Sequence, residues 1–175
     1  MSNRDETPAP RPNWFRILTI GRRPGNTLLR VTVLIFVCLI VFGFRILLPI
    51  RVEGISMLPT YTDKSVHIIN CLPYWFHGPQ RGDIVSIRLA GIHVMYLKRI
   101  IALPGETIAF ENGHAVVNGQ PLAEPYEKWS CDWNMPPEKL APGEYFVVGD
   151  NRTMPIELHV HGRVQRDRIL GKILL

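Results

Sequence analysis

Cysteine is scarce in this chain of 175 residues, which contains only Cys38, Cys71 and Cys131. The sequence has no Cys-x-x-Cys pair and no cluster of cysteine and histidine, so it predicts neither a disulfide framework nor a zinc site. A single bridge between Cys71 and Cys131 stays open, because sequence does not show whether two Cα atoms come within bonding range. We expect no bound metal and no cofactor.

A basic surface stripe is also missing, although the formal net charge is +5. Only Asp5 and Glu6 oppose the six arginines of the first 30 residues, which are Arg4, Arg11, Arg16, Arg22, Arg23 and Arg30. After residue 50 the acids and bases nearly balance, and no basic run alternates with aromatic residues. Because nucleic-acid surfaces carry such runs, the basic excess belongs to an N-terminal tail, and we expect no nucleic-acid partner.

Long amphipathic helical patterns are absent too, and the one long apolar run covers residues 28–50. Roughly 20 apolar residues can cross a bilayer as a helix, and Arg30 and Arg45 can extend toward its two interfaces. No small-residue cleavage site follows, so we expect a permanent anchor rather than a removed signal sequence; a buried helix of a soluble protein is the other alternative.

The positive-inside rule gives this anchor a direction. The tail, residues 1–27, is expected in the cytoplasm, and residues 51–175 are expected on the outer side of a cell inner or plasma membrane. The lipid bilayer is therefore one expected partner, and the chain crosses it once.

Residues 51–175 contain short segments rich in β-branched and aromatic residues, separated by glycine and proline. Such segments predict strands. The expected strands are residues 65–70, 83–89, 94–103, 107–110, 115–117, 144–148, Val164 and 169–174. The predicted fold class is mainly β, preceded by one N-terminal transmembrane helix.

A small insertion is expected at about residues 112–143. Asn112-Gly113 and Asn118-Gly119 predict tight turns around a short hairpin. Residues 120–143 contain five prolines and no strand pattern, so we interpret them as an irregular insertion on the main β-fold, and a plain long loop is the open alternative. A separate aromatic cluster, residues 74–76, is expected either in the core or at the lipid headgroups.

Ser56 is a polar residue in apolar surroundings just beyond the apolar run, with Gly54 and Pro59 on either side. A serine hydroxyl is a weak nucleophile and needs a base to take its proton. Strand alternation places Lys98 on an apolar face beside Tyr96. Because burial lowers the pKa of a lysine and a neutral amine is a general base, Ser56 and Lys98 form a candidate catalytic pair.

Four segments carry a resemblance to a known family: residues 56–60 (SMLPT), 81–85 (RGDIV), 96–106 (YLKRIIALPGE) and 149–152 (GDNR). In this order behind a spanning helix, they resemble the bacterial type I signal peptidases. These are membrane-bound Ser-Lys serine proteases that remove signal peptides from exported precursor proteins. The resemblance covers residues 28–175 and implies a signal-peptidase-like β-fold with a small insertion.

The resemblance implies that Ser56 attacks the scissile carbonyl while Lys98 accepts the proton and returns it to the leaving amine. It also implies an oxyanion hole that includes the backbone N–H of Ser56. Further residues implied around the site are Gly54, Met57, Pro59, Tyr96 and Arg99 for the oxyanion and substrate, and Asp83, Gly149, Asp150, Asn151 and Arg152 as structural support. Asp150 and Arg152 are candidates for a bracing ion pair. The implied partners are signal-peptide-bearing precursors with small residues before the cut, bound like an added strand.

The segment after residue 152 departs from the family pattern. Gly162 is kept, but Pro155, Glu157, Leu158 and His159 stand in place of Ser, Asp, Ser and Arg. In the family the missing serine resembles an orienter of the base lysine, and Thr153 is one candidate substitute. Three alternatives stay open for His159 and His161: exposed strand residues, a metal pair or a histidine base. A catalytically weak or inactive relative that binds exported peptides or partners is the alternative function.

Overall fold

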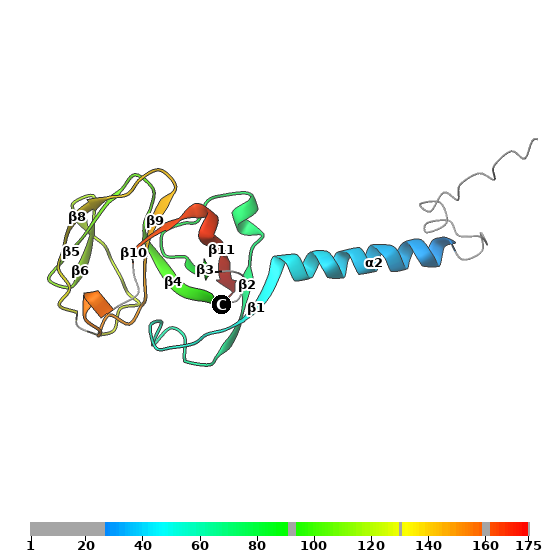
Figure 1. The fold of residues 1–175 in the computed structure, drawn as a ribbon, viewed down its shortest axis with the longest axis horizontal. Coiled ribbons are helices and arrows are strands. Elements are labelled where there is room, and N and C mark those ends of the chain that lie inside the picture. The colour runs from blue at the N-terminus through cyan, green and yellow to red at the C-terminus, as the bar shows by residue number, and fades with distance from the viewer. Residues whose placement is uncertain (1–26, 91–93, 130, 159–161, 175) are drawn as a thin grey trace, which may run out of the picture. The chain divides into compact units, whose positions relative to one another are not determined.

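The computed structural model describes residues 27–90, 94–129, 131–158 and 162–174. The chain divides into two compact units, the first ending at Phe44 and the second beginning at Arg45. Most of one helix belongs to the first unit, and the second unit contains the strands (Figure 1).

The helix α2 (Thr27–Ile46) contains most of the apolar run. At about 1.5 Å per residue its 20 residues span about 30 Å, the thickness of the hydrocarbon core of a bilayer. Its large apolar side chains are exposed, unlike those of a helix in a soluble core. The Thr32 hydroxyl donates to the Leu28 carbonyl at 2.9 Å, so this polar group is satisfied within the helix. In the described part of the chain, α2 is the one helix long and apolar enough to cross a membrane.

The apolar run does not stay helical to residue 50. Strand β1 (Leu47–Arg51) begins directly after α2 and pairs antiparallel with β2 (Val66–Asn70). β1 is the edge strand of its sheet, where Pro49 is tolerated although it has no N–H to donate. Continuous hydrophobicity fits both a helix and a strand, so the sequence could not separate the two elements.

The second unit contains two antiparallel sheets. The larger has the strand order β1-β2-β11-β3-β4-β9-β10, and the smaller has the order β7-β6-β5-β8. The remaining elements are β3 (Ile84–Ala90), β4 (Val94–Ala102), β5 (Thr107–Glu111), β6 (His114–Val117), β7 (Gln120–Pro121), β8 (Met135–Lys139), β9 (Glu144–Val148), β10 (Gly162–Gln165) and β11 (Ile169–Leu174), with the 3-10 turns η2 (Pro73–Trp75), η3 (Ile156–Leu158) and η4 (Arg166–Arg168). The prediction of a mainly β fold behind one N-terminal apolar helix is confirmed. The expected ranges match β2 to β6, β9 and β11 to within a residue at each end.

Strand β4 carries the predicted base and has one incompletely paired side. It pairs with β3 along its length, from Ile84 opposite Arg99 to Ala90 opposite Val94. On its other side β9 pairs only with residues 99–102. Among the described residues, 94–98 of β4 therefore have no strand partner on that side, and we call this stretch the open edge.

The predicted tight turns lie in the small sheet and are confirmed. The φ angles are +49° at Asn112, +85° at Gly113, +52° at Asn118 and +76° at Gly119. Two successive residues with positive φ are what a two-residue hairpin of type I′ requires. These turns connect β5 to β6 and β6 to β7.

The interpretation of residues 120–143 as irregular is only partly right. They contain β7 and β8, whereas the described residues 122–129 and 131–134 contain no strand. Pro136 and Pro137 conceal the strand pattern of β8. They are tolerated because β8 is an edge strand of the small sheet, and a bulge between Ile108 and Phe110 interrupts its pairing with β5.

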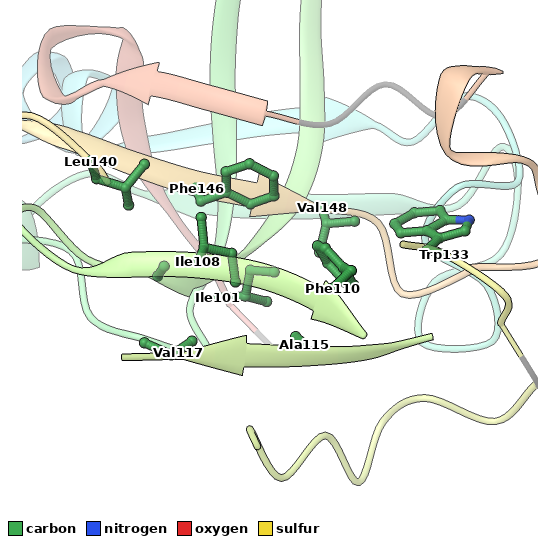
Figure 2. Close-up of a cluster of buried hydrophobic side chains, with 10 residues drawn as sticks. Ile101, Ile108, Phe110, Ala115, Val117, Trp133, Leu140, Phe146 and Val148 are labelled. Carbon is green, nitrogen blue, oxygen red and sulfur yellow. The ribbon is translucent and has the colours of Figure 1, made fainter. Parts of the chain in front are cut away.

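The hydrophobic cluster in Figure 2 joins the small sheet to β4 and β9. Ile101 of β4 and Phe146 of β9 pack with Phe110 and Trp133, whose ring centroids are 5.4 Å apart. The Trp133 Nε1–H donates to the Met154 carbonyl oxygen at 2.7 Å. This packing holds the small sheet against the segment that follows β9, which contains the GDNR residues.

The structure also answers two questions that the sequence left open, on the aromatic cluster and on the cysteine bridge. Tyr74 is buried, and its hydroxyl donates to Asp83 Oδ2 at 2.8 Å, whereas Trp75 and Phe76 are 57% and 80% exposed. Cys71 and Cys131 are both free thiols, so the bridge that the sequence left open is not formed.

Candidate active site

A short loop that leaves β1 and returns to β2 presents Ser56. Val52 donates its N–H to the Ser65 carbonyl and accepts from the Lys64 N–H, each at 2.8 Å, which closes the loop. Gly54 has a φ of +93°, a conformation that favours glycine, and its N–H donates to Asp63 Oδ1 at 2.8 Å.

The loop is anchored beneath the serine. Met57 is fully buried and packs in a cluster with Val52, Ile84 and Leu97. The Tyr61 N–H donates to the Met57 carbonyl at 2.9 Å. Ser56 itself is half-buried and lines a small cavity.

Lys98 is buried in β4, with only 2% of its surface exposed. Burial lowers the pKa of its amine to about 8, and the nearby Asp150 carboxylate works in the opposite direction by favouring the charged form. The amine does not project into bulk water. It is therefore far easier to deprotonate than an exposed lysine.

Asp150 connects β4 with the Ser56 loop. Arg99 donates to it through Nε to Oδ1 at 2.8 Å and through Nη2 to Oδ2 at 2.6 Å, and the Thr60 hydroxyl donates to Oδ2 at 2.5 Å. The guanidinium of Arg99 lies over the ring of Tyr126 at 3.8 Å. A fully buried carboxylate thus holds an arginine of β4 and a threonine four residues beyond Ser56.

Asn151 fastens the backbone of the serine itself. Its N–H donates to the Ser56 carbonyl and its Nδ2 donates to the Ile55 carbonyl, each at 3.1 Å. The side-chain oxygen accepts from the Thr153 hydroxyl at 2.7 Å and from its N–H at 3.2 Å. Thr153 therefore orients Asn151, and among the described residues its hydroxyl is not hydrogen-bonded to Lys98.

Adjacent residues of the GDNR segment thus serve the two halves of the candidate pair. Asp150 lies close enough to Lys98 to influence its pKa, while Asn151 bonds to the backbone of Ser56. Within the described residues, Ser56 Oγ and Lys98 Nζ are not hydrogen-bonded to each other. Catalytic hydrogen bonds are often long in a free enzyme and shorten when substrate binds.

The candidate ion pair between Asp150 and Arg152 is not formed. Arg152 pairs instead with Glu124 of the insertion, at 2.6 Å, and both side chains are almost fully buried. Arg152 Nε also donates to the Gly149 carbonyl at 2.9 Å, and Glu124 Oε1 accepts from the Tyr126 hydroxyl at 2.7 Å. No sequence pattern pointed to Glu124, because it lies 28 positions before Arg152 in a segment with no strand pattern.

Asp83 does not contact the Ser56 loop in the described hydrogen bonds, and it supports the large sheet near η2 and β11 instead. Its carboxylate accepts from Tyr74, from the Gln80 N–H at 3.0 Å and from Lys172 Nζ at 2.6 Å. Burial alone would raise the pKa of Asp83, but these hydrogen bonds, led by that of Lys172, hold it below its ordinary value. Asp83 stays ionised and joins η2, β3 and β11.

The altered segment after Arg152 is only partly described. Pro155 is exposed, and Glu157 is exposed within η3. His159 and His161 lie outside the described residues. Across the described ranges, no group of three or more His, Cys, Asp or Glu side chains is arranged to hold a metal ion.

A small cavity of about 50 Å³ lies beside Ser56. Its wall includes Ser56, Met57, Ser86, Met95, Tyr96 and Leu97, together with residues 50–53. Part of this wall comes from strands, since residues 50–51 belong to β1 and residues 95–97 belong to β4. A larger cavity of about 590 Å³, bordered by Leu122, Glu127 and Trp129, shares no lining residue with it.

A serine on an anchored loop, braced through Asp150 and Asn151 to a strand with a buried lysine of lowered pKa, is an arrangement typical of serine hydrolases that use an amine base. The chain belongs to the signal peptidase family, peptidase S26, whose family model matches residues 26–175.

Curated relatives agree with this assignment. Signal peptidase I of Leptolyngbya laminosa is 34% identical over 128 residues, which cover 69% of this chain and 63% of that protein. Signal peptidase I T of Bacillus subtilis is 36% identical over 134 residues, covering 70% of this chain and 69% of that protein. Among solved structures, a signal peptidase I of Enterococcus faecalis has 26% identity and a TM-score of 0.44, covering 56% of this chain and 98% of the other.

Proposed function

We propose that this protein is a membrane-anchored serine endopeptidase that removes signal peptides from exported precursors through Ser56 and Lys98. The observation that carries the proposal is the burial of Lys98, which lowers its pKa to about 8. At pH 7 about a tenth of such amines are neutral, against well under a thousandth for a lysine with a pKa of roughly 10.4.

The proposed reaction begins when Ser56 Oγ attacks the carbonyl carbon of the scissile bond and Lys98 Nζ takes the hydroxyl proton. The oxyanion that forms accepts a hydrogen bond from the Ser56 N–H. The C–N bond then breaks, and the leaving amine takes the proton from Lys98. Water attacks the resulting ester with Lys98 again as the base, which releases the acid and restores Ser56.

The open edge of β4 supports the binding of an extended peptide. Residues 94–98 offer backbone groups to an added strand, and they include the stretch next to Ser56. The cavity of about 50 Å³ beside Ser56 suits a small side chain. Both features suit a precursor with small residues just before the cut.

For the chain as a whole we propose three parts: a cytoplasmic tail (residues 1–27), an anchor (residues 28–50) and an extracytoplasmic catalytic domain (residues 51–175). The apolar helix α2 supports the anchor, although β1 already begins at Leu47. The arginine-rich tail supports the direction.

The test compares wild type with Ser56→Ala in liposomes, using a precursor that carries a signal peptide. We expect cleavage by wild type and its loss in Ser56→Ala, whereas Ser65→Ala, a matched serine outside the candidate pair, still cleaves. If wild type and Ser56→Ala are equally inert while both bind the precursor, the proposal is wrong and the alternative, a peptide-binding relative without catalysis, stands.

A further inference from the structure

The wall of the cavity beside Ser56 contains a second serine, Ser86 of β3. Ser86 is opposite Leu97 in the pairing of β3 with β4, and only 1% of its surface is exposed. The wall also contains the apolar side chains of Met57, Met95 and Leu97, together with polar residues that include Glu53 and Ser56. Ser86 is therefore a nearly fully buried hydroxyl in a wall of mixed polarity.

The Ser86 hydroxyl is poorly satisfied within the chain. It donates to Met95 Sδ at 3.3 Å, and a thioether sulfur is a weak acceptor. A substrate side chain that fills the cavity meets this hydroxyl in its wall. If that side chain is apolar, the hydroxyl stays on the weak sulfur partner, whereas a side chain with its own hydroxyl forms a proper hydrogen bond.

Resting on the proposed function, we infer that Ser86 is a specificity-determining residue that favours precursors with a small hydroxyl side chain, serine in preference to alanine, in the cavity beside Ser56. The volume of about 50 Å³ sets the limit on size, and Ser86 sets the polarity. Sites built to bond a substrate hydroxyl discriminate against analogues that lack it.

The test uses full-length protein in liposomes and precursors that differ at single positions. The starting precursor has alanine immediately before the cut and two residues further back, since an extended chain turns these two side chains to one face. Serine replaces one alanine at a time. We expect wild type to prefer serine by about two- to tenfold in kcat/KM at one of these positions, the range given by one net hydrogen bond.

Variants of Ser86 then test whether this residue causes the preference for serine. Ser86→Ala brings the ratio of serine to alanine precursors to about one, while Ser86→Thr, which keeps the hydroxyl on a β-branched side chain suited to a strand, retains the preference. Ser65→Ala, outside the cavity, keeps the wild-type ratio. A ratio of one in wild type, or a preference that survives Ser86→Ala, overturns the inference while cleavage itself upholds the proposed function.

A binding measurement separates the two proposals. On a Ser56→Ala background, which cannot cleave by the proposed route, the same peptides are titrated and their Kd values are compared with and without Ser86→Ala. A serine preference that disappears with Ser86→Ala supports the inference even if no precursor is ever cut. Equal affinities, or no binding of either peptide, contradict it. Failure of the proposed function shows instead as the absence of any Ser56-dependent cleavage.

Discussion

Asp150 accepts a pair of hydrogen bonds from Arg99, at 2.8 and 2.6 Å, and a third from Thr60. The two partners come from β4 and from the Ser56 loop, so one carboxylate fixes the Ser56 loop relative to the strand that contains Lys98. The same carboxylate raises the pKa of Lys98 against the larger effect of burial.

Asp150→Asn removes this charge and is expected to have two effects. The maximal rate falls, because Arg99 and Thr60 lose their charged acceptor. The pKa of Lys98 falls further, because the group that favoured its charged form is gone, so the midpoint of the activity profile moves to lower pH. Rates measured across pH for wild type, Asp150→Asn and the exposed control Asp132→Asn test this; an unchanged midpoint in Asp150→Asn contradicts it.

In wild type, activity is expected to rise with pH through a single ionisation near 8 and then level off. The reason is that Lys98, with its pKa lowered to about 8 by burial, accepts a proton only in its neutral form, which predominates above that pH. A profile of kcat/KM measures this ionisation in the free enzyme. A profile governed only by an ionisation near about 6.5, the ordinary histidine value, and retained in Lys98→Ala, would assign the base to histidine instead.

Asn151→Asp is expected to lower kcat by roughly 10- to 100-fold. The new carboxylate cannot donate to the Ile55 carbonyl and repels it, so the backbone beside Ser56 shifts, and small displacements of a nucleophile are costly. Asn134→Asp is the matched control, since Asn134 makes a similar bond to the Asp132 carbonyl in the exposed insertion. Equal rates for both variants would show that Asn151 does not position the serine.

Glu124→Gln leaves Arg152 buried without its charge partner, which is expected to cost about 3–5 kcal/mol of unfolding free energy. Glu138→Gln removes a partner of Arg163 from a partly exposed pair, and such pairs contribute at most about 1 kcal/mol. Chemical denaturation followed by tryptophan fluorescence measures both. Similar midpoints for the two variants would show that the buried pair adds no more than the surface pair.

Pro155→Ser restores a hydroxyl at the position where the family resemblance implies an orienter of the base lysine. We expect kcat to increase, because a hydrogen bond would hold the amine toward Ser56. Single-turnover cleavage of one precursor by wild type, Pro155→Ser and Pro155→Ala is the measurement. A gain shared by both variants would come from loss of the proline rather than from the hydroxyl.

The sequence predicted the strands whose side chains alternate, and it failed where another constraint hides that alternation. β9 and β11 match their expected bounds, whereas the start of β1 was lost in an apolar run and β8 was hidden by two prolines. The candidate pair, Ser56 and Lys98, could be predicted because each residue lies within a recognisable local motif. The roles of Glu124 and Ser86 depend on contacts between distant segments, which no local pattern reports.

The open edge of β4 also affects how readily copies of the protein associate. Unpaired N–H and C=O groups along a strand can pair with a strand of another copy and cause aggregation. Most β proteins cover such an edge or place charged residues on it. On the proposed function, residues 94–98 stay uncovered because a peptide substrate pairs along them to reach Ser56. A bound peptide would then also occupy the free backbone groups and oppose pairing between copies of the chain.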